Sequence, residues 1–347
     1  MQANDLLHTC IAHHASDLHL SAGLPPMMRV HGDIQNLSEE PLTAEAAESL
    51  LRSITTPEQW ARFTDELEID FSYVVGDLAR FRVNVFMQQR GPAAVFRVIP
   101  SKVLTLAELG APASFADFAL LPRGLVLVTG PTGSGKSTTL AAMVNHLNEH
   151  ANGHILTIED PIEFVHQPKN CLINQREIGG QTKSFSAALR SALREDPDAI
   201  LVGEMRDLET IRLALTAAET GHLVFGTLHT SSAPKTIDRI IDVFPGDEKP
   251  MVRAMLSESL QAVISQALCK NIAGNGRVAA YEIMVGTAGI RNLIRESKVA
   301  QMYSMIQTGS SAGMQTLDQS LTELVRKKKI SLDEARVLAR SPEEIRG

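Results

Sequence analysis

The sequence predicts an α/β protein of two domains, and three observations lead to that prediction. In the second part of the chain, helical segments separate four apolar, β-branched runs, at 124–129, 154–159, 199–203 and 223–228. Runs that are apolar on both faces are typical of buried parallel strands, and helices between such strands give a doubly wound sheet. The first part mixes short strand and helix patterns instead. The length of 347 residues exceeds one typical core.

The first domain is expected over residues 1–99, as a mixture of strands and helices. Strand patterns lie at 17–20, 28–34, 79–87 and 93–99, and helical patterns lie at 43–51 and 57–67. Phe81, Val83 and Val85 alternate with polar residues, which predicts a strand with one buried face. Gly32 and Asp33 form a turn signal inside the second strand pattern.

A connecting segment at 100–122 contains Pro and Gly residues that punctuate the chain, so we place the domain boundary there. The second domain is then expected over 123–347. A doubly wound sheet binds its ligand beyond the carboxyl ends of its parallel strands. After about residue 248 the pattern indicates almost only helices.

Composition narrows the function classes. Hydrophobic residues make up 44% and charged residues 21% of the chain, which is typical of soluble globular proteins. No apolar stretch approaches the roughly 20 residues of a membrane-spanning helix, and the N-terminus lacks the pattern of a signal peptide. We therefore expect a cytosolic protein that meets the membrane only through a partner.

The net charge of −7 argues against nucleic acid as a partner, because proteins that hold DNA phosphates usually carry a basic surface. Cys10, Cys171 and Cys269 are too few and too widely spaced for a disulfide framework or a Cys-x-x-Cys zinc site. We expect three reduced, mostly buried thiols.

The segment 130–137, GPTGSGKS, fits the phosphate-binding loop pattern G-x-x-x-x-G-K-[ST]. An apolar strand pattern precedes it and a helical pattern follows it, as this motif requires. Lys136 is expected to reach the β- and γ-phosphates of ATP, and Ser137 to ligate Mg²⁺. The residues expected to bind the nucleotide are Gly130, Thr132, Gly133, Ser134, Gly135, Lys136, Ser137 and Thr138.

Carboxylates follow two of the predicted parallel strands, at the edge where a nucleotide would bind. The run 199–203 leads into Glu204, the arrangement of a Walker B strand, which holds a carboxylate near Mg²⁺ or its bound water. The run 154–159 leads into Asp160 and Glu163, and Glu163 is a candidate for the base that orients the attacking water. A solvated turn explains the second group equally well. The residues leave open whether Glu163 or Glu204 is the base.

Two histidines bracket the run 223–228. His229 follows its carboxyl end, on the ligand side, and is a candidate sensor of the γ-phosphate. His222 precedes the run, roughly 20 Å away, and is expected to be structural or to lie at an interface. A buried, hydrogen-bonded core histidine is the alternative for a lone histidine of this kind.

Three arginines, Arg80, Arg82 and Arg97, lie on the last predicted strands of the first domain. Arg80 and Arg82 share one face of their strand. An arginine supplied by a neighbouring subunit can stabilise the transition-state charge of ATP hydrolysis. A solvated basic face is the alternative.

Taken together, these motifs resemble those of the type IV pilus retraction ATPases, within the secretion ATPase superfamily, over nearly the whole chain. The segments that carry the resemblance are an N-terminal signature at 15–20, the Walker A loop at 130–137, an Asp box at 159–163, the Walker B strand at 200–204, a His box at 220–229 and the motif GIRNLIRE at 289–296. In the last motif Gly289 stands where the family has Ala.

The resemblance implies a PAS-like N-terminal domain, a RecA-like ATPase domain and a homohexamer that binds Mg-ATP between the two domains. It implies that Glu163 is the catalytic carboxylate and Glu204 the partner of Mg²⁺ or water. His229 would sense the γ-phosphate. Arg82 and Arg97, ahead of Arg80, would be the arginine fingers. The implied function is pilus retraction for twitching motility, in which the segment 100–122 is the hinge and an inner-membrane platform protein the partner.

Other functions of the superfamily and beyond it make different predictions. The accessory retraction ATPase PilU shares most of the motifs and is both a rival and a candidate partner. Pilus assembly and secretion ATPases usually add an N-terminal domain and a four-cysteine zinc insertion, and the sequence has no Cys-x-x-Cys pair. A nucleic-acid translocase predicts hydrolysis stimulated by DNA. A nucleotide-binding scaffold without catalysis predicts that Lys136→Ala has no effect on function.

Overall fold

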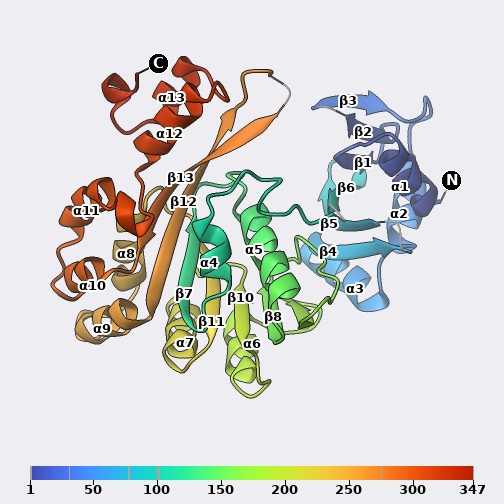
Figure 1. The fold of residues 1–347 in the computed structure, drawn as a ribbon. Helices are drawn as coiled ribbons and strands as arrows, with labels where there is room; N and C mark the ends of the chain where they lie inside the picture. Colours follow the sequence, from blue (N-terminus) through green and yellow to red (C-terminus); the bar gives the residue numbers. More distant parts are fainter. Residues whose placement is uncertain (1, 31, 77–78, 100–101, 275, 347) are drawn as a thin grey trace. The chain divides into compact units, whose positions relative to one another are not determined.

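The computed structural model describes residues 2–30, 32–76, 79–99, 102–274 and 276–346. The chain divides into two compact units, Met1–Lys102 and Val103–Gly347 (Figure 1). Pro100 and Ser101, in the predicted linker, lie outside the described residues, as does His31 in the predicted strand 28–34.

The first unit contains a six-stranded antiparallel sheet in the order β3-β2-β1-β6-β5-β4. Its strands are β1 (Asp17–Ser21), β2 (Met27–Val30), β3 (Asp33–Asn36), β4 (Glu68–Val75), β5 (Ala79–Gln88) and β6 (Gly91–Ile99). Its helices are α1 (Ala3–Ala12), α2 (Ala44–Arg52) and α3 (Pro57–Glu66). The predicted run 28–34 is therefore two strands, β2 and β3, that pair with each other across the predicted turn.

Local sequence accounts for these elements. On β5 the side chains of Phe81, Val83 and Val85 are fully buried, because alternate residues of a strand point to the same face. The helix α3 begins after Thr56, whose hydroxyl accepts a hydrogen bond from the Gln59 amide at 3.2 Å. Such a cap satisfies an amide that the helix leaves without an internal partner.

The second unit is built on a seven-stranded sheet in the order β13-β12-β7-β11-β10-β8-β9, parallel except for the pair β12 and β13. Its strands are β7 (Gly124–Thr129), β8 (His154–Glu159), β9 (Leu172–Glu177), β10 (Ala199–Val202), β11 (Leu223–Leu228), β12 (Leu260–Lys270) and β13 (Arg277–Val285). The four predicted parallel strands are β7, β8, β10 and β11. The predicted α/β fold class is confirmed.

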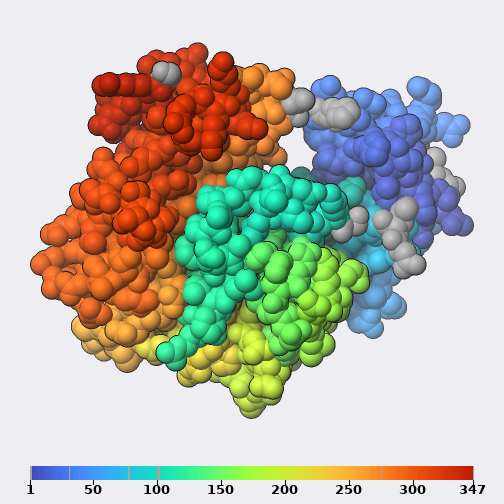
Figure 2. Space-filling model, viewed as in Figure 1, coloured from blue at the N-terminus to red at the C-terminus, as the bar shows by residue number. Residues whose placement is uncertain are grey.

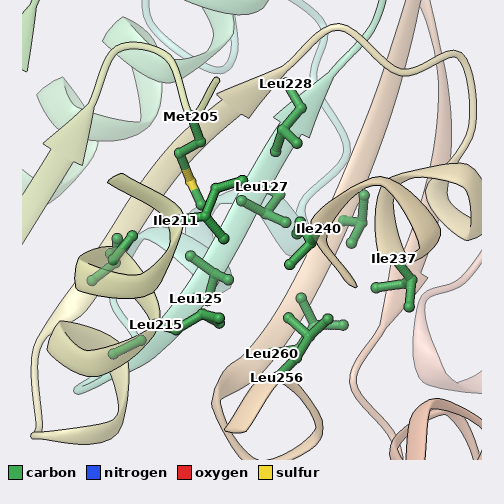
Figure 3. Packing of buried hydrophobic residues seen from close by; sticks show 14 of the residues in the cluster. Leu125, Leu127, Met205, Ile211, Leu215, Leu228, Ile237, Ile240, Leu256 and Leu260 are labelled. Atoms are coloured by element: carbon green, nitrogen blue, oxygen red, sulfur yellow. The ribbon is translucent and has the colours of Figure 1, made fainter. Parts of the chain in front are cut away.

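Helices cover both faces of this sheet. They are α4 (Ser114–Ala119), α5 (Lys136–His150), α6 (Phe185–Ala192), α7 (Leu208–Glu219), α8 (Ala233–Asp242), α9 (Lys249–Ser259), α10 (Ala288–Arg295), α11 (Met302–Thr308), α12 (Leu317–Arg326) and α13 (Leu332–Leu338). Leu125 and Leu127 of β7 pack in one cluster with residues of α6 to α10 (Figure 3). The intervening Val126 and Val128 pack with α4 and α5 on the opposite face. In Figure 2 residues 103–123 (teal) lie beside α5 (green).

The prediction that the chain after residue 248 is almost all helix is wrong, because β12 and β13 lie there. Ala262, Val263 and Ile264 are fully buried in succession. An apolar run that is buried on both faces has no polar face to show its period, so the pattern does not separate a strand from a helix. The strand β9 was also not predicted.

The helix α10 buries Ile290, Leu293 and Ile294, which share one face of the helix. The opposite face is less solvated than a plain amphipathic helix suggests. The Arg291 guanidinium donates to the carbonyls of Ser257, at the end of α9, and of Gly286. This arginine joins α10 to α9, because it satisfies carbonyl groups that the helix end leaves open.

The three cysteines are free and buried, as predicted. Burial raises the pKa of the Cys10 and Cys269 thiols to about 11, so these thiols are held in the unreactive form. Among the described residues, no helix is both long and apolar enough to cross a bilayer.

Candidate nucleotide site

The loop between β7 and α5 has the backbone geometry of a phosphate-binding loop. Gly130, Gly133 and Gly135 all have positive φ, of 142°, 79° and 88°. At Gly130 a side chain would collide with backbone, because its Cβ would lie 2.4 Å from the carbonyl oxygen of Gln266. Glycine is required there for conformation and for space alike.

Lys136 is the first residue of α5, and its side chain folds back over the loop. Its side chain is buried, and Nζ donates to the carbonyl oxygens of Gly130 at 2.9 Å and Pro131 at 3.1 Å. Burial lowers the pKa of Lys136, and the negative charge of Glu204 acts in the opposite direction. The ammonium group therefore lies at the loop, within the electrostatic reach of the predicted Walker B carboxylate.

The other predicted loop residues differ in their exposure. Ser134 is buried and its hydroxyl has no hydrogen-bond partner, while Thr132 and Ser137 are exposed and Thr138 is half-buried. An orphaned buried hydroxyl, exposed amides at the start of α5 and a buried ammonium together match the donors that phosphate groups require. The residues present fit a nucleotide phosphate, and the Ser137 hydroxyl fits the position of a Mg²⁺ ligand.

Glu204 lies just after the carboxyl end of β10. The preceding Gly203 donates its amide to the Ile158 carbonyl at 2.8 Å, and a Cβ there would lie 3.2 Å from the Glu159 Cα. The Glu204 side chain, 19% exposed, forms an ion pair with Arg206 and contacts the His229 ring. The distance from His229 Nε2 to Glu204 Oε1 is 3.1 Å.

The two histidines of β11 have different surroundings. His229 follows the carboxyl end of β11 and contacts Glu204, so the structure brings these two predicted site residues together. His222 lies at the other end, where its Nδ1 is 3.0 Å from the Ala217 carbonyl oxygen at the end of α7. His222 is thus tied to the framework at the edge away from the loop.

The acidic group after β8 separates into a buried and an exposed part. Glu159 is buried, and it accepts hydrogen bonds from Thr157 at 2.7 Å, Gln175 at 3.2 Å and the Glu163 amide at 3.3 Å. Burial raises its pKa, although these hydrogen bonds oppose the shift. Asp160 and Glu163 are exposed. Glu159 therefore orders the backbone that carries Glu163. The sequence pattern did not distinguish the buried Glu159 from the exposed Glu163.

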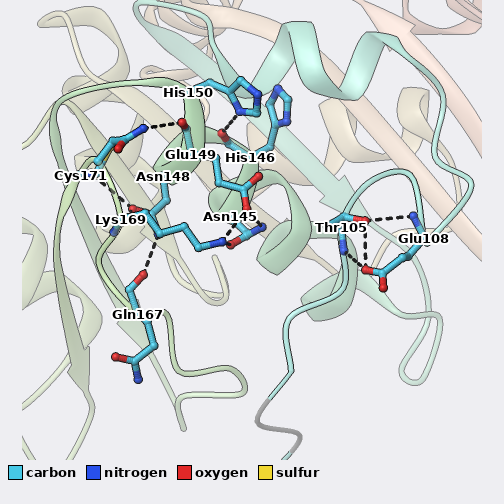
Figure 4. Close-up of polar contacts among 11 residues, drawn as sticks. Thr105, Glu108, Asn145, His146, Asn148, Glu149, His150, Gln167, Lys169 and Cys171 are labelled. Carbon is cyan, nitrogen blue, oxygen red and sulfur yellow. Dashed lines mark hydrogen bonds and ion pairs between the residues drawn. The ribbon is translucent and has the colours of Figure 1, made fainter.

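The segment that follows Glu163 is fastened to α5 by side chains of that helix (Figure 4). Asn148 is fully buried; it donates to the Gln167 carbonyl at 2.8 Å and accepts from the Lys169 amide at 2.9 Å. Lys169 also forms an ion pair with Glu149. Since α5 starts in the phosphate loop, the loop and the segment after Glu163 share one rigid support.

The predicted arginines lie in the first unit. Arg82 of β5 and Arg97 of β6 are directly paired across the sheet. Arg82 lies 4.0 Å from Asp70, and Arg97 lies 2.9 Å from Asp17. Like charges opposite each other destabilise a sheet, so this pairing is a cost that the two aspartates partly offset.

One residue near the loop was not predicted. Gln266 of β12 is buried, and its side chain bonds both the loop and α5. The available signal was an amide in the middle of an apolar, β-branched run, but the pattern of that run predicts a helix. The described residues contain no group of three or more metal-ligating side chains.

Known proteins resemble this chain over nearly its whole length. A model of the family described as "Type II/IV secretion system protein" matches residues 2–337. The chain is 65% identical to the type IV pilus retraction ATPase PilT of Pseudomonas aeruginosa over 343 residues, 99% of each chain. It is 38% identical to the type IV pilus ATPase PilU of the same organism over 346 residues, 100% of this chain and 91% of PilU.

A crystal structure described as the pilus retraction motor PilT with bound ADP matches the fold with a TM-score of 0.93. It is 46% identical, and the match covers 99% of this chain and 98% of that one.

Proposed function

The chain belongs to the type II/IV secretion system protein family, and from that premise we infer that it is an ATPase that powers retraction of type IV pili. The observation that carries this inference is the sequence identity of 65% to a retraction ATPase over 99% of both chains. The sequence identity to PilU is lower, at 38%. The buried Lys136 and the acidic strand ends supply the chemistry of ATP hydrolysis.

We propose that Lys136, Ser137 and the loop residues named above bind Mg-ATP. The buried ammonium of Lys136 would exchange its two carbonyl contacts for phosphate oxygens, a stronger charge-assisted pairing. When bound, Mg²⁺ would neutralise phosphate charge. Ser137 and Glu204 would hold the ion or its water.

Hydrolysis requires a water molecule held in line with the γ-phosphate. Glu163 is exposed in the segment that follows β8, and Glu159 fixes its backbone, so Glu163 is our choice for the carboxylate that orients this water. His229 touches Glu204 and would report the presence of the γ-phosphate to it through this contact.

Arg82 and Arg97 would act as arginine fingers in a homohexamer. Their direct pairing on an exposed sheet face supports this role, because such a concentration of positive charge suits an anion. We propose a PAS-like domain at 1–99, a RecA-like domain at 123–347 and a hinge within 100–122. Closure of these domains on nucleotide would drive the motor.

The partners follow from this function. We propose a cytoplasmic ring held at the inner membrane by the pilus platform protein, with the accessory ATPase PilU as a further partner and without nucleic acid. Each closure would displace the platform, and pilin would leave the base of the fibre.

Deletion of this chain in its host tests the function. Surface pili are counted by microscopy and surface motility is scored, with wild type and Lys136→Ala as complementing variants. We expect the deletion to leave abundant pili on immotile cells. Wild type should restore motility and Lys136→Ala should not. Bald cells would indicate an assembly motor, and normal pili with normal motility would indicate a secretion or accessory role.

A further inference from the structure

We propose that Gln266 is a positioning residue of the nucleotide site, which sets the direction of a phosphate-binding amide in the loop. The inference rests on the proposed function, since it concerns the same loop. Gln266 lies on β12, which pairs with β7 in parallel, so that Ser265 is opposite Thr129. The next residue along each strand brings Gln266 beside the first glycine of the loop.

Three contacts join Gln266 to the loop and to α5. Its Nε2 donates to the Ser134 carbonyl at 2.7 Å, and its Oε1 accepts from the Thr139 hydroxyl at 2.7 Å. Its own carbonyl oxygen lies where a Cβ at Gly130 would fall. Thr139, Ser134 and Gln266 are each buried, at 1%, 3% and 4% exposed, so water does not compete for these bonds.

Chemistry fixes the orientation of the Gln266 amide. The Ser134 carbonyl can only accept a hydrogen bond, so the NH₂ group must face it and the amide oxygen must face Thr139. Gly135 leaves the space for this arrangement, because a Cβ there would lie 2.8 Å from Nε2. The amide is thereby locked between the loop and the first turn of α5.

The bond to Ser134 has a consequence for the phosphate site. A trans peptide is planar, and its C=O and N–H groups point in opposite directions. With the Ser134 carbonyl held toward the Gln266 side chain, the N–H of Gly135 must point away from that side chain. In a phosphate-binding loop, such N–H groups cradle the phosphates. Gln266 therefore aims a donor that it does not itself supply.

A second contact extends this support to the C-terminal hairpin. Gln266 is opposite Tyr281 across β12 and β13. Burial raises the pKa of the Tyr281 hydroxyl. Ser134, Gln266 and Thr139 thus form one buried, hydrogen-bonded group beside the strand position of this tyrosine.

Gln266→Met tests the proposal, because Met has nearly the same shape and makes neither hydrogen bond. Affinities for ADP and AMP are measured by titration of the full-length protein. The donor serves the β-phosphate, so we expect ADP affinity to fall about tenfold while AMP affinity changes by less than about twofold. KM for ATP should rise more than kcat falls.

Matched variants separate this role from plain stability. Gln261, on the same strand, donates to the Arg123 carbonyl at the opposite end of the sheet, so Gln261→Met should leave the ratio of ADP to AMP affinity unchanged. Thr139→Ser keeps its hydroxyl and should also preserve the ratio. Gln266→Glu keeps only the Thr139 bond and should lower ADP affinity further.

A parallel loss of ADP and AMP affinity in Gln266→Met, or an unchanged ADP affinity, would overturn the proposal. So would an equal effect of Gln261→Met. If the wild-type chain itself binds no ADP, the proposed function fails as well. If wild type binds and hydrolyses nucleotide normally, only the role of Gln266 is at issue.

Discussion

His229 Nε2 lies 3.1 Å from Glu204 Oε1, although the two residues follow different strands of the sheet. The contact forms because β10 and β11 are parallel neighbours, which end at the same edge. The predicted γ-phosphate sensor and the predicted Mg²⁺ partner are thus in direct contact.

Glu204→Gln and His229→Gln should not act independently. Each should lower kcat/KM for ATP, and the double variant should be less impaired than the product of the single effects, with a coupling of about 1 kcal/mol or more. Steady-state kinetics of the three variants measure the coupling. His222→Gln, at the far end of β11, is the control and should combine additively with Glu204→Gln. Additivity in the His229 pair would show that their contact has no part in turnover.

Glu163 and Glu204 should differ in their response to Mg²⁺. Glu163→Ala should lower kcat on the order of 100-fold or more, and excess Mg²⁺ should not restore it, because a base is missing. Glu204→Ala should recover part of its activity in excess Mg²⁺, since mass action refills a weakened site. Phosphate release assays across a Mg²⁺ titration compare the two variants. Full turnover by Glu163→Ala would mean that Glu163 is not the base.

Arg97 and Arg82 should act on the site of a neighbouring subunit. Arg97→Gln and Lys136→Ala chains should each be inactive alone, and co-assembled mixtures should regain part of the ATPase activity, because some sites then combine an intact lysine with an intact arginine. Arg62→Gln is the control and should stay active alone, because Arg62 forms only an ion pair with Glu66 on the exposed side of α3. A mixture no more active than its components would exclude a finger in trans.

His166 should make the folded protein less stable in mild acid. Burial, with a contribution from Lys169, lowers its pKa from 6.5 to about 4. Below pH 6.5 the unfolded chain binds a proton that the folded imidazole does not, so the free energy of unfolding falls as pH falls toward the folded pKa. The loss should reach about 2 kcal/mol near pH 5.

Urea unfolding of wild type and His166→Phe at about pH 7 and about pH 5 measures this loss. The variant should lack most of it, because Phe does not titrate. Substitution of the exposed His13 by Gln should leave the pH dependence as in wild type. An identical pH dependence in His166→Phe would assign the acid sensitivity to other groups.

Gly130→Ala should weaken both folding and nucleotide binding. The new Cβ would lie 2.4 Å from a backbone oxygen at a φ of 142°, so the loop must shift. We expect a loss of about 2 kcal/mol or more in unfolding free energy and a large loss of ADP affinity. Gly246→Ala, with no atom within 4 Å of its Cβ, should change stability by less than about 0.5 kcal/mol. Normal ADP affinity in Gly130→Ala would contradict the close packing of the loop on β12.

The sequence by itself determined the features that are local in the chain. The runs at β7, β8 and β11 lie where their apolar residues predicted, and the phosphate loop follows β7 because its glycines, Lys136 and flanking patterns are contiguous. Side-chain period and turn chemistry act within a few residues, so they can be read without the fold. The acids and the histidine at the strand ends could be named for the same reason.

Only the tertiary structure decided which distant residues meet. Gln266 reaches Ser134 across 132 positions of sequence, and it does so because β12 pairs with β7. The separation of buried Glu159 from exposed Glu163, and the pairing of Arg82 with Arg97, likewise depend on strand order and register. These are set by packing of the whole sheet, which no local window contains. A buried strand such as β12 has no polar face, so its period is hidden until its neighbours are known.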